Sequence, residues 1–61
     1  MAMALEIRER QKNHLSDLLI IKKATVGQSI PALEDAILRA VIPMESEDVA
    51  WVEKLIGIKA I

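Results

Sequence analysis

The stretch that decides the fold is ALEIRERQKNHLSDLLIIKKAT, residues 4–25, which contains neither Gly nor Pro. It is rich in Leu, Glu, Arg, Lys and Gln, all of which favour the α-helix. At about 100° per residue, the apolar side chains of this region gather on one stripe roughly 160° wide, opposite a polar face. The stripe contains Ala4, Ile7, Leu15, Leu18, Leu19, Ile21 and the following Val26. The pattern predicts one long amphipathic helix.

Glycine and proline delimit a second, shorter helix. Gly27 follows the last residue of the apolar stripe. Helices often end with a residue in the left-handed conformation, which glycine adopts readily. Pro31 suits the first turn of a new helix because the N–H that it lacks would have had no partner there. Pro43 disfavours helical geometry in the residue before it. We therefore expect a helix over residues 31–42.

The third helix has a clear start signal. Ser46 is a favourable N-cap residue, and Glu47 and Asp48 place negative charge at the positive end of the helix dipole. Gly57 follows the last apolar residue of the segment and suits a left-handed C-terminal position. These signals predict a helix over residues 47–56.

The chain is expected to be all-α and to form a single helical domain over residues 1–61. No run of residues alternates in the manner of a β-strand, and no repeat of 20 to 50 residues fits in this length. The long helix would measure about 33 Å, against about 18 Å and 15 Å for the short ones. Two short helices cannot cover its apolar face, so the sequence predicts a small helical bundle completed by oligomerisation, with the long helices of two copies paired antiparallel or crossed.

Composition supports the same expectation. Apolar residues make up 52% of the chain, and twenty of its residues are Ile, Leu or Val. A domain of this size buries only about 60% of the surface that its unfolded chain exposes, so a homo-oligomer is predicted. The helix over 31–42 leaves Leu38 and Ile42 off its packing face, which makes them the best candidates for an intersubunit surface. A protein partner is also expected, and Trp51, the only aromatic residue, would be a natural anchor for it. The candidate interface residues are Leu15, Leu18, Leu19, Ile21, Leu38, Ile42 and Trp51.

Several functional classes fit the sequence poorly. The longest apolar runs, residues 18–21 and 40–44, are too short for a membrane span, and the absence of cysteine and of a signal-peptide pattern predicts a cytoplasmic protein. His14 is the only histidine and has Asp17 three residues after it, and no nucleophile or second histidine accompanies it. We expect no enzymatic activity, no metal and no cofactor.

The charge distribution argues against a nucleic-acid partner. The net charge is −1, with +2 on residues 1–30 and −3 on residues 31–61. The second helix of a potential helix-turn-helix pair would carry Glu34 and Asp35 towards the phosphates. A DNA-binding transcriptional regulator therefore remains a third hypothesis.

Two functional hypotheses rank above it. The first is a non-enzymatic regulator or inhibitor that binds a protein partner through an apolar surface, a function that suits small proteins of phages and mobile elements. The second is sequestration of a small anionic ligand, such as a nucleotide signal, at a subunit interface. Its candidate residues are the polar groups that interrupt the apolar stripe of the long helix: Arg8, Gln11, His14 and Lys22.

Overall fold

The computed structural model describes residues 2–61 of the chain, and within them it contains three helices and no strand. The helices are α1 (Ala2–Ala24), α2 (Pro31–Val41) and α3 (Ser46–Ile56). The prediction of an all-α chain with one long and two short helices is confirmed, and each boundary falls within two residues of the predicted one. The side chain of Ala4, assigned to the apolar stripe, lies outside the part that the structure describes.

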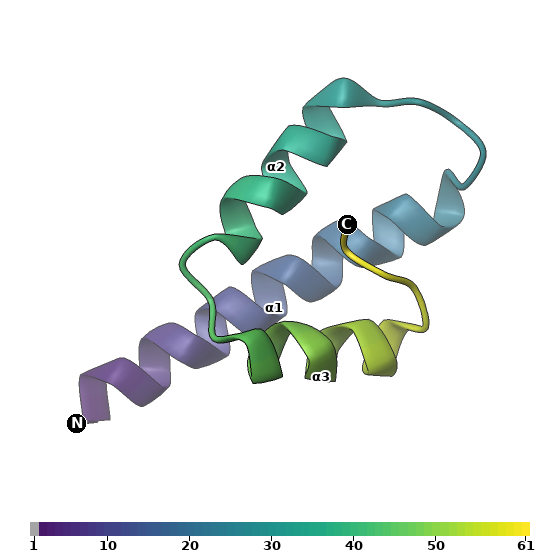
Figure 1. Cartoon of the computed structure of the whole chain (residues 1–61). Coiled ribbons are helices and arrows are strands. Elements are labelled where there is room, and N and C mark those ends of the chain that lie inside the picture. The colour runs from purple at the N-terminus through teal and green to yellow at the C-terminus, as the bar shows by residue number, and fades with distance from the viewer. Residues whose placement is uncertain (1) are drawn as a thin grey trace.

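The long helix is the spine of the molecule. The chain measures 40 × 20 × 16 Å, and α1 runs along its longest dimension (Figure 1). The two short helices pack on α1 and make little contact with each other. In Figure 1, α2 runs back against the direction of α1, α3 runs broadly along it, and the first turns of α1 extend past both.

A small core forms where the two short helices meet the spine. Leu15 and Leu19 of α1 are fully buried, together with Ile37 of α2 and Val52 of α3. The assignment of Leu15 and Leu19 to an intersubunit surface is therefore wrong, because α2 and α3 already cover the part of the stripe on which they lie. Other apolar residues pack partly buried around them: Leu18, Leu33, Ala40, Val41, Met44, Val49, Ile56 and Ile58.

Helix α3 begins one residue earlier than its sequence signal. Glu45, and not Ser46, occupies the N-cap position with an extended backbone, and no side chain caps the helix. The carbonyl oxygen of Glu45 accepts the N–H groups of Asp48 at 3.0 Å and Val49 at 3.1 Å. The prediction of a Ser46 cap is therefore wrong, because Ser46 already lies inside the first turn.

The end of α3 is held by a glycine and a lysine. Gly57 has a φ of +87°, in the left-handed region, as the sequence predicts, and its N–H donates to the Glu53 carbonyl at 2.8 Å. The Lys23 Nζ, in the last turn of α1, donates to the carbonyl of Ile56 at 2.9 Å. A cation from one helix thus satisfies a carbonyl at the negative end of another.

The residues after α3 fold back onto the spine. Ala60 is buried, and the Nζ of Lys22 donates at 2.9 Å to both the Lys59 and the Ala60 carbonyl oxygens. The N–H of Ala60 donates to the Glu53 carboxylate at 2.7 Å. These bonds fix the C-terminal tail, residues 58–61, as an ordered part of the fold.

Candidate interaction surface

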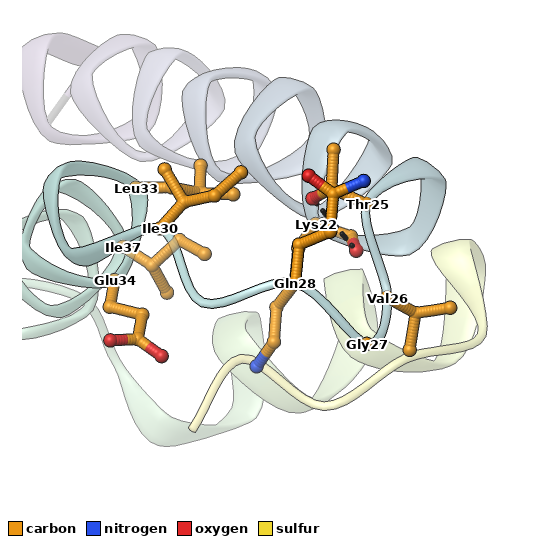
Figure 2. A pocket seen from close by; sticks show the side chains of 9 residues that line it. All are labelled: Lys22, Thr25, Val26, Gly27, Gln28, Ile30, Leu33, Glu34 and Ile37. Atoms are coloured by element: carbon orange, nitrogen blue, oxygen red, sulfur yellow. Dashed lines mark hydrogen bonds between the residues drawn. The ribbon is translucent and has the colours of Figure 1, made fainter.

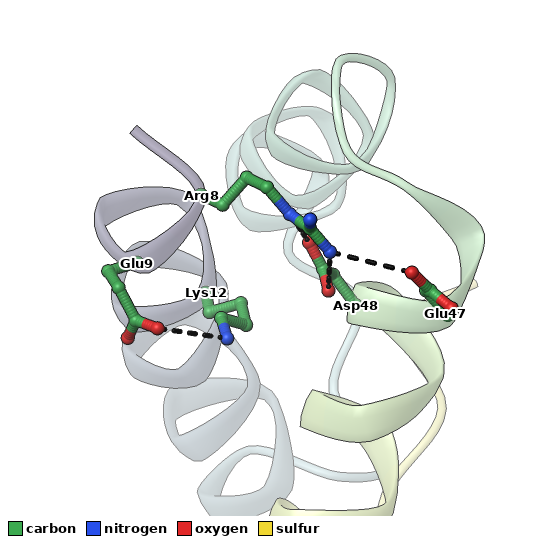
Figure 3. A network of polar contacts seen from close by, with 5 residues as sticks. All are labelled: Arg8, Glu9, Lys12, Glu47 and Asp48. Atoms are coloured by element: carbon green, nitrogen blue, oxygen red, sulfur yellow. Dashed lines mark hydrogen bonds and ion pairs between the residues drawn. The ribbon is translucent and has the colours of Figure 1, made fainter. Parts of the chain in front are cut away.

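The four polar residues proposed from the sequence as an anion site do not converge. Arg8 lies near the N-terminal end of α1 and binds α3, with Nε 2.9 Å from Oδ2 and Nη2 2.9 Å from Oδ1 of Asp48 (Figure 3). Its Nη2 also lies 3.5 Å from Oε1 of Glu47. Lys22 lies about 21 Å further along the helix, at 1.5 Å per residue, and holds the C-terminal tail. Both cations therefore have internal partners.

The ion pair between Arg8 and Asp48 is a structural element. Only 6% of Asp48 is exposed, and its carboxylate accepts two parallel hydrogen bonds from the guanidinium. Hydrogen bonding by Arg8 lowers the pKa of Asp48, and the same bonds raise the pKa of Arg8. A pair of this geometry orients α3 on α1 and leaves little capacity for an external anion.

Gln11 and His14 lie apart from those two cations, at a groove between α1 and α2. The groove has a volume of about 440 Å³, and His14 at its edge is exposed. The α2 side of the groove includes Arg39, which was not among the residues predicted from the sequence. The Nε of Arg39 lies 2.9 Å from Oδ2 of Asp35. The complete lining is Gln11, His14, Ala36, Arg39, Ala40 and Pro43.

A second cavity lies where the α1–α2 connection meets α2. Its volume is about 100 Å³, well below the several hundred Å³ of typical ligand sites. Figure 2 shows Ile30, Leu33 and Ile37 grouped on one side of it, with Lys22 and Gln28 on the other. This cavity is too small for a nucleotide.

A third cavity opens between α2 and the C-terminal tail. It has a volume of about 310 Å³, and four of its six lining residues are apolar. Glu34 and Lys22 contribute the polar part of its rim. The apolar lining is Ile37, Leu38, Ala60 and Ile61, and we call these four residues the α2–tail surface.

Most of the predicted interface residues outside the core are exposed. Ile21, Leu38, Ile42 and Trp51 are between 46% and 72% exposed, whereas Leu18 is partly buried against the core. Sequence reasoning did not assign six other exposed large apolar residues to an interface: Leu5, Ile7, Ile20, Val26, Leu55 and Ile61. Leu5 and Ile20 lie outside the apolar stripe predicted for the long helix, and the exposure of Ile61 depends on the path of the tail, which no sequence pattern reveals.

Trp51 of α3 lies half exposed beside a cation of α1. The Lys12 Nζ is 5.0 Å from the centre of the indole ring, within the range of a cation–π contact. Lys12 also pairs with Glu9 at 3.2 Å (Figure 3). The indole is half exposed, so it contributes apolar surface next to a fixed charge.

The described residues contain no group of three or more metal-binding side chains. Nor is any helix in residues 2–61 long and apolar enough to cross a membrane. Comparison of the chain with protein-family models, curated proteins and solved structures found no match. The exposed apolar side chains are the candidate functional feature that the structure displays.

Proposed function

We propose that this chain is a small non-enzymatic protein that self-associates and acts on a protein partner through apolar contacts, as a regulator or inhibitor. One observation carries the proposal. Among residues 5–61, ten large apolar side chains are 46–76% exposed, whereas five apolar residues form the buried core. Single exposed apolar residues are ordinary, but so large a share of exposed aliphatic area marks protein–protein surfaces.

Four of the exposed apolar residues lie in two distinct regions. Ile7 and Ile21 lie on α1, seven residues before and seven residues after His14, and they supply the face for a second copy. Leu38 and Ile61 lie at the α2–tail surface, and they supply the face for a different protein. The cavity there, of about 310 Å³, has the volume for an apolar anchor residue, and such anchors supply most of the affinity of compact interfaces.

The two other hypotheses gain less support. Sequestration of an anionic ligand needs free cations around one cavity, and Arg8 and Lys22 are engaged in internal contacts at separate places on α1. DNA binding needs several phosphate contacts, and α2 carries Glu34 and Asp35 on its exposed side. Neither a nucleotide nor duplex DNA is expected to bind at physiological salt.

Light scattering on the purified chain tests the proposal. We expect a mass at least twice the 6.8 kDa of one chain at micromolar concentration. A single 6.8 kDa species at every concentration would overturn self-association. Calorimetric titrations with nucleotides and with duplex DNA belong to the same test, since saturable binding of either would replace the proposed function with one of the two alternatives.

Charge substitutions then locate the surfaces. Leu38→Asp and Ile21→Asp each place a carboxylate on an exposed position, so the helical circular dichroism spectrum should be retained. Ile21→Asp is expected to lower the mass, and Leu38→Asp to leave it unchanged while abolishing partner binding. Ser29→Asp adds the same charge in the exposed connection before α2 and serves as the matched control.

A further inference from the structure

We propose that two copies of this chain pair through α1 in antiparallel orientation, with the two-fold axis beside His14. The contact surface is the α1 stripe, which we define as Ile7, His14 and Ile21. This inference rests on the proposed self-association and specifies its partner, its orientation and its register.

The spacing of the stripe places its three residues on one line. Successive members are seven residues apart, which is close to two turns of an α-helix, so their side chains project from the same face. Ile7 is 49% exposed, Ile21 is 48% exposed, and His14 is exposed between them. The buried positions Leu15 and Leu19 lie on a different face, so α2 and α3 leave this line open.

The stripe is symmetric about its centre. Ile7 and Ile21 each lie about 10.5 Å from His14 along the helix, at 1.5 Å per residue. In an antiparallel pair, Ile7 of one copy therefore meets the partner's Ile21, and this apolar contact forms twice. The His14 side chains of the two copies meet at the axis. Every position of the stripe thus has a counterpart, as a self-complementary two-fold interface requires.

Charges beside the stripe select the antiparallel orientation. Arg10 lies four residues before His14 and Asp17 three residues after it, and both are exposed. An antiparallel partner brings Arg10 close to the partner's Asp17, again twice. A parallel partner would place the Arg10 and Asp17 side chains of the two copies on opposite sides of the interface, so neither contact would form. Each exposed pair is worth at most about 1 kcal/mol, and Arg10 also pairs with Glu6 of its own chain at 3.3 Å, so the charges bias the orientation and the symmetric apolar contacts carry the affinity.

The groove beside His14 provides room at the axis. Its volume of about 440 Å³ is bounded by the small side chains of Ala36 and Ala40. The charged group that faces His14 from α2 is Arg39, which is held by its ion pair with Asp35 at 2.9 Å. Side chains of the partner's α1 near the axis can therefore enter the groove without displacing α2.

Disulfide trapping tests the orientation directly, because the native chain contains no cysteine. Chains carrying Ile7→Cys and Ile21→Cys, one of them isotopically labelled, are mixed and oxidised under mild conditions. We expect a mixed disulfide between the two variants and little homodimer of either, because a disulfide forms only across Cα separations below about 7 Å. Ser29→Cys, exposed and away from α1, is the control for random collision.

The outcomes separate the two proposals. Homodimers of Ile7→Cys with itself would establish a parallel pair and overturn the orientation. A wild-type mass of two chains without any of these disulfides would overturn the use of the α1 stripe but leave self-association standing. A wild-type mass of 6.8 kDa would overturn both.

A charge swap provides an independent measurement. Arg10→Asp and Asp17→Arg are each expected to raise the dimer dissociation constant several-fold, because each places like charges together in the antiparallel pair. The double variant restores the attraction and should return the constant towards the wild-type value. Failure of the double variant to recover affinity, with its helix content intact, would contradict the antiparallel register.

Discussion

Arg8 in α1 and Asp48 in α3 form a two-bond ion pair across forty residues of sequence, with both N–O distances at 2.9 Å. The carboxylate also lies in the first turn of α3, where the helix dipole favours negative charge. The same side chain therefore stabilises a helix start and fixes that helix to the spine.

Replacement of Asp48 should destabilise the fold more than replacement of its neighbour. Asp48→Asn removes the charge from a buried carboxylate and leaves Arg8 without its main partner. Glu47→Gln alters a longer contact of 3.5 Å whose carboxylate is largely exposed, so it is the matched control. We expect a clearly lower urea midpoint for Asp48→Asn and a nearly unchanged one for Glu47→Gln. Equal midpoints would show that the ion pair contributes nothing.

Acid should weaken the fold through the same pair. The pKa of Asp48 lies below its ordinary value of 3.8 because Arg8 donates hydrogen bonds to the ionised form. As the pH falls, the unfolded chain therefore takes up this proton before the folded chain does. The stabilisation of the fold by the ion pair is complete above pH 3.8 and is lost as the pH falls through the folded-state pKa of Asp48. The free energy of unfolding should fall more steeply between pH 4 and pH 2 in the wild type than in Asp48→Asn. Parallel curves would contradict this assignment.

Two leucines of α1 offer a matched test of the core. Leu19 is fully buried and Leu5 is 62% exposed, so the same substitution probes opposite environments on one helix. Leu19→Ala should lower the free energy of unfolding by about 2–5 kcal/mol through lost burial and the cavity left behind. Leu5→Ala should change it by about 0.5 kcal/mol or less. Chemical denaturation followed by circular dichroism measures both.

Alanine at either left-handed glycine should lower the stability of the fold, and the loss should be larger at Gly57. Gly27 and Gly57 have φ values of +91° and +87°, where a Cβ costs about 1–2 kcal/mol. Open space surrounds Gly27, but a Cβ at Gly57 would lie 3.3 Å from the Lys23 Nζ, which binds the end of α3. The midpoint temperature of thermal unfolding should therefore be lower for Gly57→Ala than for Gly27→Ala.

Loss of the lysine that holds the C-terminal tail should release the tail and spare the helices. Lys22→Met keeps most of the unbranched side chain but removes both hydrogen bonds to the tail carbonyls. Amide exchange at Ala60 should then rise towards that of an open chain, while the core of α1 keeps its protection. Lys54→Met, at an exposed position of α3, controls for the loss of charge. Unchanged exchange at Ala60 would show that the Glu53 carboxylate alone holds the tail.

Helix content and helix ends followed from local signals in the sequence. The 3.6-residue periodicity located the spine, and Gly27, Pro31 and Gly57 marked boundaries because their backbone constraints are intrinsic to the residue. The prediction from Ser46 was wrong because N-capping is not intrinsic to the residue. Whether a serine caps a helix or enters its first turn depends on the chain before it, and here Glu45 takes the cap position.

The surface could be predicted only in part. Periodicity assigned Leu15, Leu19 and Ile21 to one stripe, but it could not show that α2 and α3 would bury the first two and leave the third open. The partners of Arg8 and Lys22 lie 40 and 37 or 38 residues away, so no local pattern indicated that these cations were already satisfied.

The shared spine has a consequence for how the chain folds. Because α2 and α3 pack on α1 and hardly touch each other, neither short helix retains a native neighbour once α1 is lost. Helices of eleven residues are marginal in water by themselves. Loss of α1 should therefore unfold the whole molecule in one cooperative transition. Circular dichroism and Trp51 fluorescence are then expected to give coincident unfolding curves.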